Sequence, residues 1–431
     1  MSRQGYLYFA IMAALLIAVG FGQSWNVALG ILNLCLISAV MSLGVNIQWG
    51  YAGLFNVGVM GFAALGGLTA VLISMPPVKD AWAVGGAGIG LSLLALIGTV
   101  IAVILVRRIT PAFAKLWVTT ITIVIGLFVI RIVYAPAVDR IEAINPAHTG
   151  YLGGLDLPIV FSWLVGGFVA AGAAWVIGKI SLGLRADYLA IATLGISEII
   201  IAILKYEEWL SRGVKNVTGL PRPVPYEVNL VQSDWFVSFA SWFGVDTVDT
   251  ASVFVKLCYA FLFLIVLGII MWLSESALKS PWGRMMRAIR DNRDAANAMG
   301  KDVTRRHLQV FILGCAVCGI AGAMMTTLDG QLTPSSYIPL RYTFLIWVMV
   351  IIGGSGNNWG AVLGGFVIWF LWIEAEPLGN GLMQIITLPM DDGYWLKDHL
   401  IASAAYTRLI MMGAILLIVM RFAPKGLIPE R

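Results

Sequence analysis

Long apolar runs separated by short polar connections recur along the whole chain. They lie at residues 6–21, 27–48, 57–74, 84–105, 116–133, 158–180, 188–204, 252–273, 308–328, 343–352, 361–374 and 405–420. Several reach about 20 residues, the length at which a helix crosses the hydrocarbon core of a bilayer. Others are too short to cross alone, which indicates broken or re-entrant segments. The pattern predicts an all-α polytopic integral membrane protein, with one transmembrane domain over residues 1–431 and about 10–12 helical membrane segments.

Composition supports this class and excludes an ordinary soluble protein. Of the 431 residues, 59% are hydrophobic and 12% are charged, and the mean hydropathy is +0.88. A soluble domain is roughly 25% charged. The net charge of +5 would suggest nucleic acid binding in a soluble chain. In a membrane protein it reports loop orientation instead, because Lys and Arg gather in cytoplasmic loops, so we expect no nucleic acid partner.

The basic residues orient the predicted helices. Eight of them lie between residues 277 and 306, which we therefore place in the cytoplasm: Lys279, Arg284, Arg287, Arg290, Arg293, Lys301, Arg305 and Arg306. Other inner positions are marked by Arg107, Arg108, Lys115, Lys179, Arg185, Arg421 and Lys425. Alternation along the spans then places both termini in the cytoplasm.

Acidic residues and tryptophans mark the opposite side. Residues 206–250 are predicted to form an outer, periplasmic insertion because they carry Glu207, Glu208, Glu227, Asp234, Asp246, Asp249, Trp209, Trp235 and Trp242. Tryptophan is enriched at membrane interfaces. Residues 377–399 are interpreted in the same way.

Two glycine-rich stretches interrupt the apolar pattern, at residues 50–58 and 353–360. Opened backbone at membrane depth is tolerated where it lines a wet cavity, and such breaks form substrate sites in transporters. The alternative is a tight turn with close helix packing, which the spacing of Gly356, Gly360 and Gly364 suits. We favour that alternative for the second stretch. In the first, Tyr51 and Asn56 add polar groups, so both interpretations stay open and both residues are candidates for the substrate pathway.

One acidic residue stands out within an apolar span. Glu198 lies in residues 191–200, close to Thr193. A carboxylate inside a membrane is costly and is therefore a functional hypothesis, so we expect Glu198 and Thr193 to line or gate the substrate pathway. The alternative is a neutral acid, or one that caps backbone donors of a neighbouring helix.

Cysteine and histidine positions indicate neither a metal site nor a catalytic site. Cys315 and Cys318 could form a redox pair, but two small residues on one face of a membrane helix are the more ordinary interpretation. His148, His307 and His399 are far apart in the sequence. No metal or catalytic residue is therefore expected, and the chain is not interpreted as an enzyme.

The most polar stretch of the chain lies at residues 280–300. If residues 285–299 form one helix, Ile289, Ala296 and Met299 fall near one face. Gly300 has the position of a C-terminal helix signal. Asp294, Ala295 and Ala296 precede it, and the two alanines would let a partner approach the helix backbone closely.

The Asp-Ala-Ala-x-x-x-Gly spacing resembles the EAA loop of ABC importer permeases. Asp294 takes the acidic position, Ala295 and Ala296 the alanine pair, and Gly300 the glycine; Asp in place of Glu is a departure. Residues 184–195 (LRADYLAIATLG), 50–58, 283–290, 353–356 and 421–427 resemble stretches of the branched-chain amino acid permeases of the LivM type. The resemblance covers residues 34–427, but the 206–250 segment looks longer than the family's usual outer loop.

The resemblance implies an ABC importer permease fold, and it implies that ATP is bound and hydrolysed by separate subunits. The chain has no G-x-x-x-x-G-K-[ST] motif, so it carries no P-loop for ATP and no cofactor is expected in it. Two ATP-binding subunits would hold ATP-Mg and dock at residues 277–306, with Arg290, Asp294, Ala295, Ala296 and Gly300 as coupling residues. A second related permease and a periplasmic binding protein would complete an importer in the bacterial inner membrane. The implied substrates are branched-chain or related amino acids.

Two alternatives remain at this point. Related permeases carry urea and short-chain amides. A stand-alone secondary transporter would need its own coupling-ion site at the membrane midplane, for which Glu198 is the single candidate.

Overall fold

The structure is a computed structural model, and it describes residues 3–111, 113–145, 149–242, 244, 246–390 and 395–430. His148 and residues 391–394, which include part of the predicted outer segment at 377–399, lie outside the described residues.

The described residues are almost entirely helical. The first half contains α1 (Arg3–Gly22), α2 (Trp25–Ala52), α3 (Val59–Ser74), α4 (Lys79–Ala81), η1 (Trp82–Gly86), α5 (Ala87–Ile109), α6 (Lys115–Glu142), α7 (Ile159–Ser181), α8 (Ala186–Tyr206), α9 (Glu208–Ser211), η2 (Gly213–Lys215) and β1 (Val217–Thr218). The second half contains α10 (Glu227–Val231), α11 (Asp234–Ser241), α12 (Thr247–Lys279), α13 (Pro281–Asp291), α14 (Arg293–Ala298), α15 (Val303–Asp329), β2 (Gln331–Leu332), η3 (Pro334–Ser336), α16 (Pro339–Gly353), α17 (Asn358–Thr387), α18 (Trp395–Ser403), η4 (Ala404–Tyr406) and α19 (Thr407–Phe422).

Among the described residues, nine helices are long and apolar enough to cross a membrane, and the bent pair α18–α19 would make a tenth. α3 and α16 are shorter apolar helices. The predicted polytopic all-α architecture is therefore confirmed. One boundary was wrong: the apolar run at 361–374 continues through Pro377 to Thr387 as α17, so part of the expected outer segment is helix. A proline inside a membrane helix is tolerated where neighbours satisfy the freed backbone groups.

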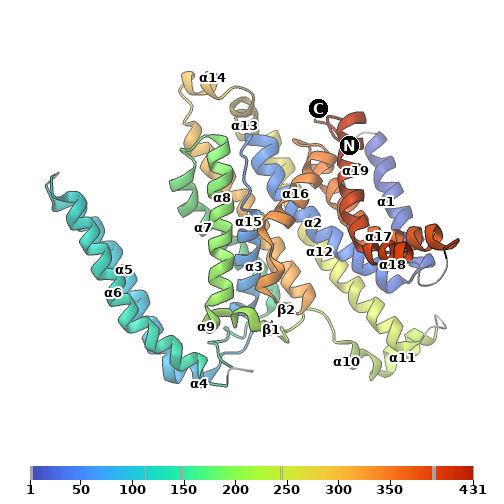
Figure 1. Ribbon diagram of the computed structural model, residues 1–431, viewed down its shortest axis with the longest axis horizontal. Coiled ribbons are helices and arrows are strands. Elements are labelled where there is room, and N and C mark those ends of the chain that lie inside the picture. The colour runs from blue at the N-terminus through green and yellow to red at the C-terminus, as the bar shows by residue number, and fades with distance from the viewer. Residues whose placement is uncertain are drawn as a thin grey trace.

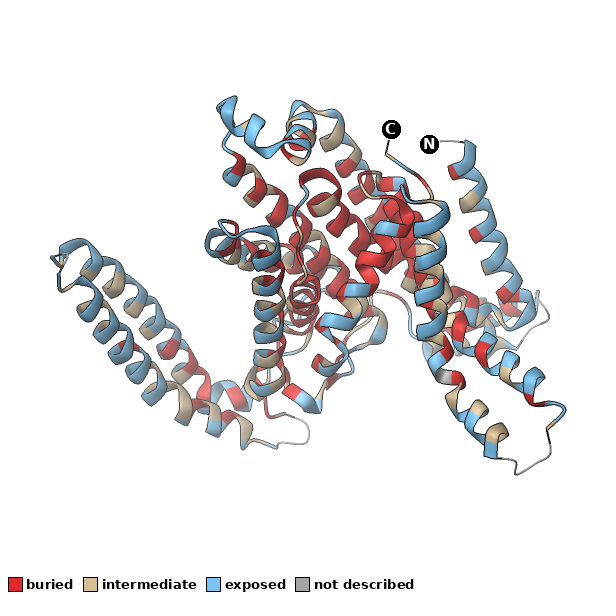
Figure 2. Cartoon of the chain, turned by 45° about the horizontal axis from the view of Figure 1, so that its top comes forward, coloured by how far each residue is buried: buried red, intermediate tan, exposed pale blue. Residues whose placement is uncertain are grey.

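The buried centre of the molecule is formed by α2, α3, α7, α15, α16 and α17, and small residues bring these helices close together (Figures 1 and 2). A Cβ atom at Gly66 would overlap the backbone of Gly319 on α15, and one at Gly322 would overlap Ala63 on α3. Small residues at helix interfaces allow this close backbone approach, and the resulting van der Waals packing stabilises membrane helix bundles.

The α5–α6 hairpin stands apart from this centre and is largely exposed (Figure 2). Its base is attached to the α8–α9 junction, where the Tyr134 hydroxyl and the Trp209 indole contact the Glu207 carboxylate.

The two ends of the molecule carry different structures. At one end, α13 and α14 lie on the same side as both chain termini (Figure 1). At the other end, the 206–250 segment contains short helices and the strand β1, which pairs antiparallel with β2 so that Val217 lies opposite Leu332. This pairing fixes the segment to the end of α15.

Candidate functional site

The polar stretch at 280–300 forms two helices where one was predicted. Ser280 caps α13 by accepting a hydrogen bond from the Gly283 amide, and Met286 and Ile289 bury one side of this helix. At Asn292 the backbone becomes extended (φ −152°), and the Asn292 side chain accepts a hydrogen bond of 2.9 Å from the Ala295 amide. The prediction of one helix over 285–299 was wrong because Asn is a strong N-cap, and it starts a new helix here.

The coupling residues predicted on α14 lie on the surface. Asp294, Ala295 and Gly300 are exposed, and Ala296 is half-buried against the core. Gly300 has φ +72°, and the amides of Gly300 and Lys301 donate to the carbonyl groups of Asn297 and Ala296. This is a Schellman motif with glycine in the left-handed position, so the predicted role of Gly300 as a helix stop is confirmed.

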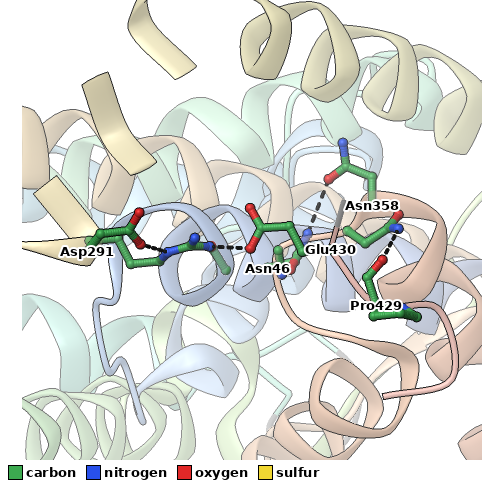
Figure 3. Close-up of polar contacts among 9 residues, drawn as sticks. Asn46, Asp291, Asn358, Pro429 and Glu430 are labelled. Carbon is green, nitrogen blue, oxygen red and sulfur yellow. Dashed lines mark hydrogen bonds and ion pairs between the residues drawn. The ribbon is translucent and has the colours of Figure 1, made fainter. Parts of the chain in front are cut away.

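Arg290 does not share this surface. Its Nη1 donates to the Gly50 carbonyl oxygen at 2.5 Å and to the Glu430 carboxylate at 2.8 Å, and its Nε donates to Asp291 at 3.1 Å (Figure 3). Burial lowers the pKa of the guanidinium, but the hydrogen bonds to Glu430 and Asp291 outweigh this and hold the pKa above its ordinary value. Arg290 therefore points inward and connects α13 to the glycine-rich stretch at the end of α2.

That stretch is an opened segment of backbone between α2 and α3. α2 ends at Ala52, the following residue Gly53 has φ +65°, and α3 begins only at Val59. Asn56 supports the intervening loop: its Nδ2 donates to Gln48 at 2.9 Å, its Oδ1 accepts from the Gly58 amide, and its carbonyl oxygen accepts from the Trp347 indole at 3.0 Å. Asn56 is 1% exposed, so its side-chain amide holds the loop in place through hydrogen bonds made in the buried interior.

The second glycine-rich stretch lies directly beside the first. The Gly356 amide donates to Asn46 Oδ1 at 2.9 Å, and the Tyr51 hydroxyl donates to Asn358. Asn358 in turn donates to Glu275 on α12. A Cβ atom at Gly50 would overlap both Asn46 and Gly356, so glycine is required where the two stretches meet.

The C-terminal tail completes this arrangement. The amides of Leu427 and Ile428 donate to the carbonyl groups of Ile352 and Gly353 at 2.8 and 2.9 Å, and Asn357 donates to the Pro429 carbonyl (Figure 3). Glu430 then meets Arg290. We refer to the contacts of Arg290, Gly50, Asn46, Gly356 and Glu430 as the Arg290 junction. It joins α13, both glycine-rich stretches and the tail.

Thr193 lies at the break, whereas Glu198 does not. The Thr193 hydroxyl accepts a hydrogen bond of 3.1 Å from the Val57 amide, and Thr193 is 1% exposed. Glu198 lies on the exposed side of α8. Glu198 is therefore not buried within this chain, because α8 buries the neighbouring face, which carries Thr193 and Ser197.

A cavity of about 160 Å³ lies between the break and α13. Its lining includes Gly53, Phe55, Arg290, Arg293 and His307, and we call it the Arg290 cavity. Phe55 also belongs to a group of three rings: those of Trp49, Phe55 and Trp347 contact one another with centroids 4.6 to 5.7 Å apart. Edge-on aromatic contacts at these distances are stabilising, so the three rings form a compact aromatic cluster beside the break.

Several residues of this site were not predicted from the sequence. Asn46 and Gln48 are polar residues within an apolar run, both at most 1% exposed, and this was a usable signal because buried amides need partners. Glu430 and Trp347 carry no comparable signal. The thiol groups of Cys315 and Cys318 are buried and unbridged, and Cys315 contacts Gln48. Among the described residues, no cluster of His, Cys, Asp and Glu has the arrangement of a metal site.

Comparisons with known proteins agree on one family. The family model described as branched-chain amino acid transport system, permease component, matches residues 81–420. A probable branched-chain amino acid transport permease protein LivM of Methanocaldococcus jannaschii is 24% identical over 398 residues, covering 91% of this chain and 90% of the relative.

Two further relatives match smaller parts. The high-affinity branched-chain amino acid transport system permease protein LivM of Escherichia coli is 24% identical over 268 residues, or 62% of this chain and 56% of the relative. A probable branched-chain amino acid transport permease protein LivH of Methanocaldococcus jannaschii is 27% identical over 216 residues, or 50% of this chain and 60% of the relative. No solved structure matches the chain.

Proposed function

The chain belongs to the family of permease components of branched-chain amino acid transport systems, and we propose that it is the membrane subunit of an ABC importer for branched-chain or closely related amino acids. The observation that carries this proposal is the Arg290 junction. It connects an exposed helix suited to a partner with the opened backbone of α2. An importer driven by separate ATP-binding subunits needs a connection of this kind between the surface where they dock and the membrane-spanning helices.

Separate subunits would supply the energy. The sequence has no P-loop motif, the loop that holds ATP phosphates through its backbone amides. We infer that two ATP-binding subunits, which hold ATP-Mg, dock on α13 and α14 and displace them when they close. Arg290 would pass that displacement to Gly50. Residues 277–306 would then be the cytoplasmic coupling loop, in a bacterial inner membrane with both termini inside.

A second permease is the partner that the exposed surface of α8 requires. Glu198 is exposed in the middle of an apolar helix, and a carboxylate facing lipid is strongly disfavoured. We infer that a helix of a related permease covers this face. Similarity to relatives named both LivM and LivH supports a pair of unlike permeases. A periplasmic binding protein would deliver substrate at the 206–250 side.

The aromatic cluster is the proposed gate of the pathway. Phe55 belongs to the break and also lines the Arg290 cavity. Trp347 is tied to the break through its hydrogen bond to the Asn56 carbonyl. Movement of Gly50 by Arg290 would therefore shift the loop that carries Phe55 and open the cluster. Tyr51, Asn56 and Thr193 position this loop in the proposed mechanism.

The proposed function is tested by uptake of ¹⁴C-leucine and ¹⁴C-urea in the source cells. Deleting the gene for this chain is expected to abolish ATP-dependent leucine uptake and to leave urea uptake unchanged. Expressing the chain from a plasmid should restore leucine uptake. Loss of urea uptake alone would favour an amide importer. Leucine transport by the purified chain in liposomes without ATP or other subunits would contradict the proposal in favour of a secondary transporter.

The docking surface has its own test, the substitution Ala295→Glu. Ala295 is exposed, so folding is expected to be unaffected, whereas an unpaired carboxylate buried under an ATP-binding subunit should lower uptake by about tenfold or more. The measurements are leucine uptake and the amount of chain in the membrane. The matched control is Asn297→Glu, two residues along the same helix and on its opposite side. Unchanged uptake and substrate-stimulated ATP hydrolysis in Ala295→Glu would remove α14 from the docking surface.

A further inference from the structure

A second cavity lies among the central helices, away from the Arg290 junction. It has a volume of about 210 Å³ and lies between α2, α3, α15, α16 and α17. Its lining includes Ile37, Ser38, Met41, Asp329 and Met349. We call it the Asp329 cavity.

One acidic group and one donor in this cavity have no partner within the described part of the chain. The Asp329 carboxylate makes no hydrogen bond or ion pair there, and the residue is exposed although it ends a membrane helix. The indole nitrogen of Trp369, a lining residue on α17, is buried and also has no hydrogen-bond partner among the described residues. Buried donors are almost always paired, so an unpaired one beside a cavity indicates a ligand or water.

Apart from the hydroxyl groups of Ser38 and Tyr342, the remaining walls are apolar. Ile37, Met41, Leu345 and Met349 are each at most 5% exposed. Pockets for drug-sized ligands measure about 300–1,000 Å³, so a cavity of 210 Å³ suits a smaller molecule. Methionine walls adapt to aliphatic groups of different shape.

We propose that the Asp329 cavity holds the substrate on its way through the membrane. The Asp329 carboxylate would accept hydrogen bonds from the substrate ammonium group, and the Trp369 indole would donate to the substrate carboxylate. The aliphatic side chain would lie against α2 and α16. This inference rests on the proposed function and narrows it, because a carboxylate favours a cationic ammonium group over a neutral amide such as urea.

The position of the cavity fits a pathway. Its α2 residues lie at 34–41, and the Arg290 cavity begins at Ala52 on the same helix. Trp49 lies between these stretches, and its partner Trp347 lies between the lining residues Ile346 and Met349 on α16. Along α2, Trp49 therefore lies between the proposed substrate site and the cavity beside the coupling helix, and its ring contact with Trp347 reaches the level of the substrate site on α16.

The test compares variants in cells that carry the complete transport system. Asp329→Asn is expected to raise the KM for leucine roughly 10- to 100-fold with the amount of chain in the membrane unchanged, because it weakens a charge-assisted hydrogen bond. Asp139→Asn, which changes an exposed carboxylate on α6 of the peripheral hairpin, is the matched control. Met349→Phe should reduce uptake of leucine more than uptake of alanine, since it fills the cavity, whereas Ile351→Phe on the exposed side of α16 should reduce neither.

The outcomes separate this proposal from the proposed function. Wild-type leucine uptake with an unchanged KM in Asp329→Asn and an unchanged leucine-to-alanine ratio in Met349→Phe would overturn the cavity alone. The cavity proposal would also be overturned if Met349→Phe reduced the uptake of leucine and of alanine equally while Asp329→Asn kept a normal KM for leucine. Absence of leucine uptake by the wild-type system would overturn the proposed function itself.

Discussion

Replacing Arg290 by alanine is expected to lower ATP-driven leucine uptake by about tenfold or more while the chain still reaches the membrane. The substitution removes the hydrogen bonds to the Gly50 carbonyl and to Glu430. One hydrogen bond to a charged group contributes about 1.5–3 kcal/mol, and about 1.4 kcal/mol corresponds to a factor of ten. The ATP-binding subunits would still bind and hydrolyse ATP, but movement of α13 would no longer reach the break.

The informative measurement is the ratio of leucine molecules imported to ATP molecules hydrolysed in the reconstituted system. This ratio should fall in Arg290→Ala and stay normal in Arg284→Ala, which removes an exposed arginine from the same helix. Glu430→Gln should give an intermediate effect, because the hydrogen bond to Gly50 remains. A normal ratio in Arg290→Ala would mean that the Arg290 junction is structural only, and equal loss in Arg284→Ala would mean that the general positive charge of α13 matters.

The helical segments could be predicted because hydropathy over about 20 residues reports directly on burial in a bilayer. The helix stop at Gly300 could be predicted for a similarly local reason, since glycine tolerates the left-handed conformation at little cost. The same logic favoured a tight turn with close packing for the second glycine-rich stretch, and the structure confirms it: Gly354 and Gly356 have φ +117° and +83°.

The direction of individual side chains could not be predicted. Arg290 looks like its basic neighbours in the sequence, but it turns inward because two acceptors distant in sequence, Gly50 and Glu430, meet there. Glu198 lies in an apolar run, and membrane helices are apolar on both buried and lipid-facing sides, so hydropathy carried no information on which side it occupies. Both failures concern tertiary contacts that no local pattern encodes.

A large loss of stability is expected from Gly364→Ala. Gly364 lies on α17 against α16, and a Cβ atom there would overlap the Met349 carbonyl oxygen and crowd Gly353. The neighbours are backbone atoms of a buried helix, so they cannot yield as a flexible side chain would. Inserting atoms into a well-packed interior typically costs about 1–3 kcal/mol and occasionally more.

Gly381→Ala on the same helix is the matched control, because its Cβ atom would meet nothing within 4 Å. Alanine there should preserve or raise stability by up to about 1 kcal/mol, since glycine is the poorer helix former. The melting temperature of each detergent-solubilised, fluorescently tagged variant should therefore fall in Gly364→Ala and hold or rise in Gly381→Ala. Equal melting temperatures would show that α16 and α17 can separate at little cost. In that case Gly353 and Gly356 would be held in position by their hydrogen bonds to the C-terminal tail and to Asn46, and not by the packing of α16 against α17.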